Sequence, residues 1–442
     1  MSLHKPEATE SVIPASGSRK QAAAVKSRFS IRNLRTFASL QNANYRFYFI
    51  GMVGQWGAMN MQMVSKSMLL YRLTGSAALL GVMALASAIP QILFSLFGGA
   101  IADRVSKKMI LQIGQLASAA VSVSVGVCLT TGYLSAENPG SSWVLIAQSA
   151  LQGSIMALMM PSRSAIIPEI VGTNQVMNAM ALNSLGMNTL RLLAPALAGF
   201  LIDFAGFEAI FYAMAGLYVF ATVLTSFIHV KRPEPSSYSN QKRNSTIGDI
   251  KEGLAYIWHE RPIFIVLAFT LVVVLLSMPY QMLMPIFADD ILNVGATGMG
   301  LLMSVSGIGA MAGSLVIASL PNKKRGIMLL GSSLLLGLAL AAFAFSRSMP
   351  LSLGIMIFVG LGQAGRMTLG TTLLQSYSAE KYFGRVMSIN MLDMGLSSLG
   401  TFAAGVLAED VGAAIAIGGF AGLLAVASFL SLIFMKRIRR LQ

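Results

Sequence analysis

Four charged side chains lie inside long apolar stretches of this sequence: Lys66, Arg191, Arg366 and Asp393. A charge at the centre of a bilayer costs from about 3 to over 10 kcal/mol, so such groups are usually paired or face water. Arg366 and Asp393 fall at similar depth in two successive antiparallel runs, which predicts an ion pair. The pair is either a permanent structural contact or a switch in which Asp393 binds a proton and releases Arg366, because burial and a neighbouring cation push a carboxyl pKa in opposite directions.

Lys66 shares one helical face with Gln55 and Gln62, at a spacing of seven and then four residues. Three polar groups on one face are a poor match for lipid, so this face is predicted to line a cavity. The alternative is that Lys66 extends to the membrane surface and only anchors its helix.

Arg191 precedes a segment of small residues that contains Pro195 and Gly199. Small residues permit close backbone approach and proline permits bending, so this segment is predicted to form a hinge. Arg191 either faces the cavity or is a structural residue satisfied by Asn188 or nearby carbonyl groups.

Other polar and methionine side chains fall on the runs expected to surround the cavity. Most of the 29 methionines are expected to be ordinary packing, but flexible thioethers also suit a site that adapts to varied apolar ligands. The remaining predicted cavity residues are Asn60, Met63, Asn183, Tyr280, Gln281 and Gln363.

The composition predicts the elements that position these groups. Of 442 residues, 55% are hydrophobic and 11% are charged, whereas a soluble chain carries about 25% charged residues. Each apolar run is long enough, at about 20 residues, to cross a bilayer as a helix with its backbone hydrogen bonds satisfied internally. We therefore predict an all-α membrane protein with twelve transmembrane helices, at 47–71, 76–101, 108–132, 142–161, 177–202, 207–229, 262–288, 297–319, 326–346, 350–376, 385–408 and 413–435.

The net charge of +15 is a topology signal. With the N-terminus in the cytoplasm, the cytoplasmic segments hold all but five of the 32 Lys and Arg residues, and the outer loops are acidic. This asymmetry is the positive-inside pattern and predicts that both termini are cytoplasmic. Nucleic-acid binding is therefore not expected. The five exceptions are Lys66, Arg72, Arg191, Arg347 and Arg366.

Catalytic and metal-binding patterns are missing from the sequence. The single cysteine, Cys128, lies inside an apolar run, and the three histidines fall in the N-terminal tail or near predicted cytoplasmic helix ends. Neither a catalytic triad nor a metal-ligand spacing is found. We expect neither an enzyme nor a bound cofactor.

The chain divides into two similar halves. We predict a basic N-terminal tail (1–44), a six-helix bundle (45–230), a cytoplasmic linker (231–261), a second six-helix bundle (262–436) and a basic C-terminal tail (437–442). Within the linker, apolar residues recur at helical spacing and predict an amphipathic surface helix. Residues 198–206 resemble residues 404–412, which makes the fifth and eleventh helices equivalent copies.

A charged segment between the second and third runs carries a family resemblance. It resembles the loop Gly-x-x-x-Asp-Arg-x-Gly-Arg-Arg of major facilitator superfamily transporters, with Ser106 in place of the second glycine and lysines in place of the last two arginines. Segments 73–76, 160–169, 193–199 and 384–388 narrow the resemblance, over about residues 45–436, to the branch of the enterobactin exporter and macrolide-efflux proteins. The matching loop residues are Gly99, Asp103, Arg104, Lys107 and Lys108.

The resemblance implies two pseudo-symmetric six-helix bundles, a major facilitator fold, with an inner gate at this loop. It implies that Asp103 docks at the eleventh helix, near Gly384 and Arg385, and that Arg104 seeks an acid, for which we propose Glu169. Lys107 and Lys108 are equally explained as anchors that fix the topology. Ser149 stands where many superfamily antiporters carry an arginine, so coupling through that residue does not transfer to this chain.

The resemblance also implies a function. We expect an exporter in the bacterial inner membrane, a monomer that uses the proton gradient to move an amphipathic small molecule, either a drug-like compound or a siderophore, by alternating access. The alternatives are a lysophospholipid or other lipid transporter, a metabolite importer of the same fold, and a membrane sensor that transports nothing.

Overall fold

A computed structural model describes residues 35–229, 246–321, 323–390 and 392–441. These residues form helices joined by short turns, with no strand among them. The predictions for most of the N-terminal tail and for the first half of the linker fall outside the described residues.

The first half of the chain contains five long helices. α2 begins after Asn42, whose side chain accepts hydrogen bonds from the backbone N–H groups of Asn44 and Tyr45, and it ends at Gly75 with a left-handed φ of 64°. The elements are η2 (Arg35–Gln41), α2 (Ala43–Thr74), α3 (Ala77–Arg104), α4 (Lys107–Thr130), η3 (Pro139–Ser142), α5 (Trp143–Val171), η4 (Thr173–Gln175) and α6 (Val176–Ser226).

The second half begins with the linker helix predicted from its apolar spacing. The elements are α7 (Thr246–His259), α8 (Arg261–Ser277), α9 (Pro279–Met282), α10 (Met284–Ile286), η6 (Phe287–Ile291), α11 (Gly295–Ser319), α12 (Arg325–Ala344), α13 (Met349–Tyr377), α14 (Glu380–Asn390), α15 (Asp393–Val411), α16 (Ala413–Phe434) and α17 (Lys436–Arg439).

Ten helices among the described residues are long and apolar enough to cross a membrane. The longest is α6, with 51 residues, and its helical torsions are interrupted at Gly206, where φ is 85° and ψ is 174°. The 32 residues of α2 also exceed the length of a membrane span, but this helix is not among the ten. The chain is therefore a multi-pass membrane protein.

The structure departs from the predicted helix boundaries in several places. The predicted runs 177–202 and 207–229 form the one element α6, and α5 continues ten residues beyond the predicted end at 161. The charged segment 99–108 is mostly helical: α3 continues to Arg104, and only two residues precede α4, whose first turn is capped by the Ser106 side chain. The predicted run 262–288 breaks at Pro279 and again at Leu283, because a proline inside a helix removes a hydrogen bond and clashes with the preceding turn. The predicted run 385–408 is split into α14 and α15 just before Asp393.

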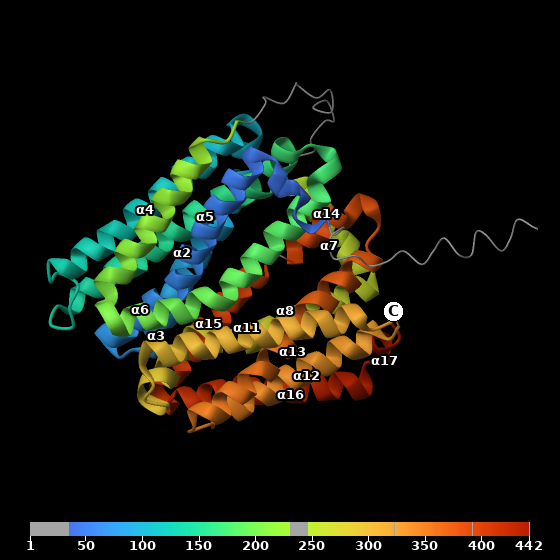
Figure 1. The fold of residues 1–442 in the computed structure, drawn as a ribbon. Coiled ribbons are helices and arrows are strands. Elements are labelled where there is room, and N and C mark those ends of the chain that lie inside the picture. The colour runs from blue at the N-terminus through green and yellow to red at the C-terminus, as the bar shows by residue number, and fades with distance from the viewer. Residues whose placement is uncertain (1–34, 230–245, 322, 391, 442) are drawn as a thin grey trace, which may run out of the picture.

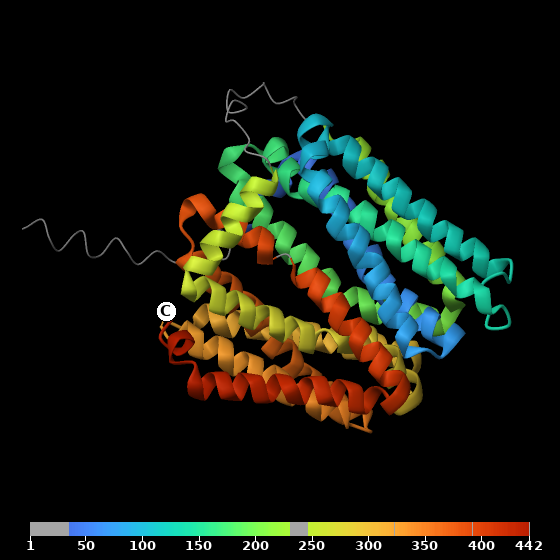
Figure 2. The ribbon, with the colours of Figure 1, turned by 180° about the vertical axis from the view of Figure 1, so that it is seen from behind.

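The helices form two groups that meet at one end and diverge toward the other (Figure 1; Figure 2, from behind). α2 and α4 pack on α6, and α3 packs on α5, in the first group; α12 packs on α13 and α16 in the second. Two pairs of helices join the groups: α3 packs on α15, and α6 packs on α11. We call these two contacts the seams.

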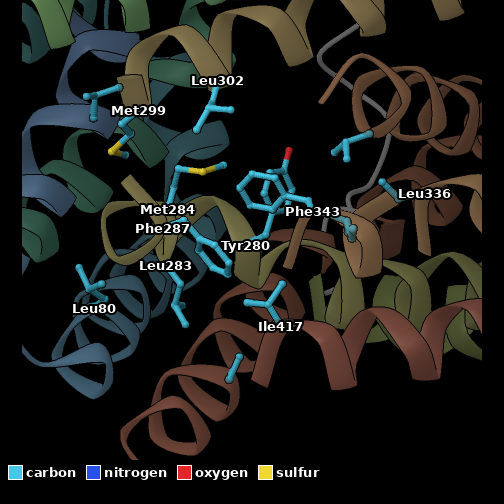
Figure 3. Close-up of a cluster of buried hydrophobic side chains, with 14 of the residues drawn as sticks. Leu80, Tyr280, Leu283, Met284, Phe287, Met299, Leu302, Leu336, Phe343 and Ile417 are labelled. Atoms are coloured by element: carbon cyan, nitrogen blue, oxygen red, sulfur yellow. The ribbon is translucent and has the colours of Figure 1, made fainter. Parts of the chain in front are cut away.

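An apolar core fills the second group near the meeting point. Figure 3 shows Tyr280, Leu283 and Phe287, from the broken segment after α8, among Leu302 of α11 and Phe343 of α12. The rings of Phe287 and Phe343 are 5.0 Å apart between centroids. The proline-broken segment thus contributes buried side chains to the core of this group, near the point where the two groups meet.

Candidate functional site

Each seam is a close backbone contact made possible by glycine. On the α6–α11 seam, a Cβ added at Gly199 would lie 2.1 Å from the carbonyl oxygen of Ala296, and one added at Gly300 would lie 2.2 Å from that of Pro195. Pro195 and Gly199, predicted as a hinge, therefore lie on the seam, and the only non-helical torsions inside α6 are at Gly206. Their role as a hinge stays a prediction.

The α3–α15 seam repeats this arrangement with the equivalent residues. A Cβ at Gly405 would lie 2.6 Å from the carbonyl oxygen of Ala77, and one at Gly81 would lie 2.7 Å from the Cα atom of Phe402. Gly405 matches Gly199 in the internal repeat noted in the sequence. The two seams are thus similar helix contacts made by residues that correspond in the predicted repeat.

An acid at the end of each repeat caps the facing helix of the other group. Asp203, at the end of the first copy, accepts hydrogen bonds from the backbone N–H groups of Ala296 (3.4 Å) and Thr297 (2.7 Å), at the start of α11. Glu409, its equivalent, accepts a hydrogen bond from the N–H of Ala78 (3.2 Å), at the start of α3. A carboxylate is favoured at a helix N-terminus, so both contacts hold the groups together.

Charged and phenolic groups reinforce this end. Arg72, at the end of α2, binds Asp289 of the second group through two hydrogen bonds of 2.8 and 3.1 Å, and its guanidinium is 3.9 Å from Asp203. Tyr71 donates a hydrogen bond to Asp290. We call residues 71–78, 203–208, 289–297 and 405–412 the closed end. The sequence analysis described the outer loops only as acidic, and no local pattern assigned these acids to Arg72 or to a helix N-terminus.

A polar cavity lies between the two groups, below the closed end. We call it the central cavity; its volume is about 70 Å³. It brings together seven of the predicted residues, from three helices and the broken segment, alongside Met303, Ser306 and Gly307 of α11, which the sequence did not single out. The predicted residues in its wall are Asn60, Met63, Arg191, Pro195, Tyr280, Gln281 and Gln363.

A second cavity, the lateral cavity, shares Met63 with the first and has a volume of about 260 Å³. Lys66 and Gln62 line it, and Lys66 Nζ lies 3.5 Å from the Ser149 hydroxyl oxygen. Ser149, the residue found where an arginine was expected, is therefore the described partner of this buried cation. Lys66 and Gln62 were predicted to line the central cavity, and the structure places them in the wall of the lateral cavity.

The third cavity, the entrance cavity, has a volume of about 400 Å³ and shares Arg191 and Gln363 with the central cavity. It lies between the first part of α6, around Asn188, and the last parts of α11 and α13, around Ser314 and Thr368. The seams therefore do not continue to this end of the molecule, which we call the open end. Together, the three cavities form a path that begins at the open end and stops at the closed end.

Arg366 and Asp393 form the ion pair expected from their depth. Arg366 Nη1 lies 3.5 Å from Asp393 Oδ2, and the Arg366 side chain is 4% exposed against 30% for Asp393. Asp393 is the first residue of α15, directly after the break that separates it from α14. Arg366 Nε and Asp393 Oδ1 are buried and have no hydrogen-bond partner among the described residues, so the pair is incompletely satisfied.

Two predicted cavity residues lie elsewhere. Gln55 is buried inside the first group, where Gln115 Nε2 donates a hydrogen bond of 2.9 Å to its side-chain oxygen. Asn183 lines none of these three cavities, and its side-chain oxygen is buried without a hydrogen-bond partner. Helical spacing placed both on polar faces, but it could not tell the interior of one bundle from the space between bundles.

At the open end, Arg385 has a partner that the sequence did not suggest. Its Nη1 lies 2.8 Å from Glu252 of α7, and Tyr382 stacks on Tyr256 with ring centroids 4.1 Å apart. The hydrogen bond from Arg385, helped by one from Tyr382, holds the pKa of Glu252 below its usual value. We call this contact between α7 and α14 the linker contact.

The predicted inner-gate residues are only partly visible. Gly384 is exposed and has open space around it, and the side chains of Gly99, Asp103 and Arg104 lie outside the described residues. Lys107 pairs with Glu169, and the predicted contact between Arg104 and Glu169 stays a prediction. Lys108 donates hydrogen bonds to the carbonyl oxygens of residues 226 (2.7 Å) and 228 (2.8 Å). These lysine contacts stay within the first group.

In the described part of the chain, no three His, Cys, Asp or Glu residues form a group that could hold a metal ion. The arrangement consists of a closed end, an open end and a polar cavity between two related groups.

Comparison with known proteins agrees with this geometry. Residues 34–440 match the family described as transmembrane secretion effector. The chain is 27% identical to the staphyloferrin A transporter of Staphylococcus aureus (76% of this chain, 82% of the relative). It is 23% identical to macrolide efflux protein A of Streptococcus pyogenes (77% and 83%) and 25% identical to the enterobactin exporter of Shigella boydii (76% of each).

The fold also matches solved transporters. A crystal structure of the nucleoside transporter NupG superimposes with a TM-score of 0.73 at 14% identity, covering 89% of this chain and all of the other. At that identity the likeness concerns the fold alone. The family match spans nearly the whole chain, and the relatives are transporters rather than enzymes. This chain belongs to the transmembrane secretion effector family of major facilitator superfamily transporters.

Proposed function

We propose that the protein is a proton-driven exporter that moves an amphipathic small molecule, a drug-like compound or a siderophore, by alternating access. The observation that carries this proposal is the cavity path between the two groups, which is reached from the open end and blocked by the seams. Rocking of the two groups about the central cavity would close the open end and open the closed end.

We propose twelve membrane spans in two six-helix bundles. The ten candidate spans become twelve when α6 is divided at Gly206 and α2 is added. The open end carries the basic helix α17, with Lys436, Arg437 and Arg439, so the positive-inside pattern orients it toward the cytoplasm, with both termini on that side of a bacterial inner membrane. An exporter in this state takes its substrate from the cytoplasm.

The names of the relatives support an exporter. Macrolide efflux and enterobactin export are outward processes, and the shared family covers both halves of the chain. The substrate differs among these proteins, so the family supports direction more strongly than cargo.

Asp393 and Arg366 are the proposed coupling site. Asp393 is the only described acid that falls inside a predicted membrane span away from the closed end, and its partial exposure gives it contact with water. Binding of a proton would remove the negative charge that faces Arg366. The freed guanidinium, already short of partners at Nε, would then favour a different arrangement of α13 and α15.

The inner gate belongs to the opposite state of the cycle. When the open end closes, we expect the Asp103 and Arg104 region to approach the start of α14, near Gly384 and Arg385. Arg385 would then exchange Glu252 for a new partner, so the linker contact would report the state of this gate.

Transport in everted membrane vesicles tests the proposal. Three probes with the same apolar body, 1-pyrenebutyrate, 1-pyrenebutanol and 1-pyrenebutylamine, are offered outside energised vesicles. We expect at least one to accumulate inside, and an uncoupler to abolish the accumulation. Accumulation of none of them, together with movement of a fluorescent lysophospholipid, would replace the proposed cargo by a lipid; movement of neither would leave a protein that does not transport.

A matched pair of variants tests the coupling site. Asp393→Asn should abolish uncoupler-sensitive accumulation while leaving insertion and thermal stability near normal. Glu137→Gln, which removes an exposed acid from a loop outside the closed end, should transport like the wild type. Near-normal transport by Asp393→Asn at every pH between 5.5 and 8.5 would refute the switch and leave the pair as a structural contact.

The remaining proposals concern partners. The proton gradient would be the only energy source, with no bound cofactor, and one chain contains both halves of the cavity, so we propose a monomer. Mass photometry in nanodiscs should give one 46.9 kDa chain per disc. A predominant two-chain species would contradict this.

A further inference from the structure

The charges around the cavities are unbalanced. Lys66 lines the lateral cavity, and Arg191 lines both the central and the entrance cavities. The described acid within reach of this region is Asp393, and it is already paired with Arg366. Membrane-embedded cations are costly unless a partner or water stabilises them. Lys66 and Arg191 are therefore two cations that lack a negatively charged partner among the described residues.

Arg191 is the more available of the two. Its side chain is exposed to the cleft, and the described residues offer it neither a hydrogen bond nor an ion pair. It lies close enough to Arg366 for the two positive charges to repel each other. Asn188, the partner suggested by the sequence, lines the same cavity without bonding to it. An arginine with a purely structural role would have hydrogen-bond or ion-pair partners, and Arg191 has none among the described residues.

Lys66 occupies the far side of the path. Its described partner is the Ser149 hydroxyl, at 3.5 Å, which supplies a dipole rather than a charge. Met63 lies in the wall of both the central and the lateral cavities. A molecule that passes Met63 therefore has one cation at each end of its path.

The rest of the lining combines amide and hydroxyl side chains with apolar, adaptable ones. Methionine side chains from both groups of helices surround the two cations, and their flexible thioethers fit apolar bodies of different shapes. Those in the cavity walls are Met59, Met63, Met156, Met187, Met282, Met303, Met311 and Met367.

We propose that the cavities select amphipathic molecules that carry a carboxylate, which Arg191 binds where the entrance cavity meets the central cavity, with Lys66 as a second anchor for a longer or doubly charged substrate. The guanidinium fork matches the two oxygens of a carboxylate. A lipophilic cation is disfavoured at the same place by like-charge repulsion. This inference rests on the proposed transport function and adds the charge class of its substrate.

Equilibrium binding of the three pyrene probes to the protein in nanodiscs tests the inference. Binding is followed by fluorescence anisotropy, with empty nanodiscs subtracted. A charged hydrogen bond contributes about 1.5–3 kcal/mol, so we expect pyrenebutyrate to bind at least about tenfold more tightly than pyrenebutylamine, a difference of about 1.4 kcal/mol. Equal affinity for the two probes, or a preference for the amine, would overturn the inference.

Variants assign the effect to Arg191. Arg191→Gln should weaken pyrenebutyrate binding about tenfold and leave pyrenebutanol unchanged, while Arg191→Lys, which keeps the charge, should recover part of the loss. Arg347→Gln removes an exposed arginine from a loop far from the cavities and serves as the matched control. Unchanged pyrenebutyrate binding in Arg191→Gln would overturn the assignment.

The same probes separate this inference from the proposed function. Energised export of pyrenebutanol or pyrenebutylamine that is as fast as that of pyrenebutyrate, and insensitive to Arg191→Gln, would keep the exporter and remove the charge selectivity. Faster export of pyrenebutyrate, lost in Arg191→Gln and retained in Arg347→Gln, would support both.

Discussion

Adding one methyl group to Gly300 should force the closed end apart. Its Cβ would lie 2.2 Å from the Pro195 carbonyl oxygen and 2.9 Å from the Cα atom of Ala196. Contacts this short require α6 and α11 to separate by roughly 1 Å, and overpacking of this kind costs about 1–3 kcal/mol. The cost applies only while the seam is formed. Gly300→Ala should therefore raise the ratio of outward-open to outward-closed molecules by about 5- to 150-fold.

Spin-label distances measure this shift. After Cys128→Ser removes the single natural cysteine, labels at Glu137→Cys and Arg347→Cys, both exposed and on the outer side of opposite groups, report the width of the outer end. Gly331→Ala is the matched control, since that glycine is also helical and a Cβ there meets open space. The reasoning is refuted if both alanine variants give the same distance distribution as the wild type.

Three further perturbations have expected outcomes. Arg72→Gln removes the partly exposed pair with Asp289 and should widen the same outer-end distance with a two- to fivefold shift in population, consistent with about 0.5–1 kcal/mol for such a pair; an unchanged distribution would exclude it from the gate. The pKa of Glu252 is depressed by Arg385, so the linker contact should persist above the normal carboxyl range and be lost as pH falls through the depressed value; hydrogen exchange in α7 should rise only at acidic pH, and Glu252→Gln should show that fast exchange at neutral pH. Asp393→Asn should also remove the pH dependence of the outer-end distance, and an unaltered pH response would argue against coupling at this residue.

Much of the architecture was accessible from the sequence because membrane helices leave a strong signal. Apolar runs, the position of basic residues and the repeat at 198–206 and 404–412 depend on composition and order, which are local properties. The pairing of Arg366 with Asp393 also followed, since two charges at the same depth in adjacent helices have few other partners.

Contacts between the groups were harder to predict. The gate contacts of Arg72, Asp203 and Glu409 join residues that are more than 90 positions apart, and no local pattern specifies such a partner. Glu169 pairs with Lys107, at the start of α4, a partner that the sequence analysis did not propose for it. Pro279 is visible in the sequence, but proline is tolerated in many membrane helices. Whether it breaks this helix therefore depends on tertiary packing.

Labelling of a single cysteine in the central cavity tests alternating access most directly. Gln281→Cys, in the Cys128→Ser background, is exposed to a membrane-impermeant maleimide from either the cytoplasmic or the outer side of vesicles. Alternating access predicts labelling mainly from the cytoplasmic side, and a marked gain in labelling from the outer side when Gly300→Ala is added. Labelling from neither side, or equal labelling from both sides that Gly300→Ala does not change, would contradict a cavity that opens alternately to the two faces of the membrane.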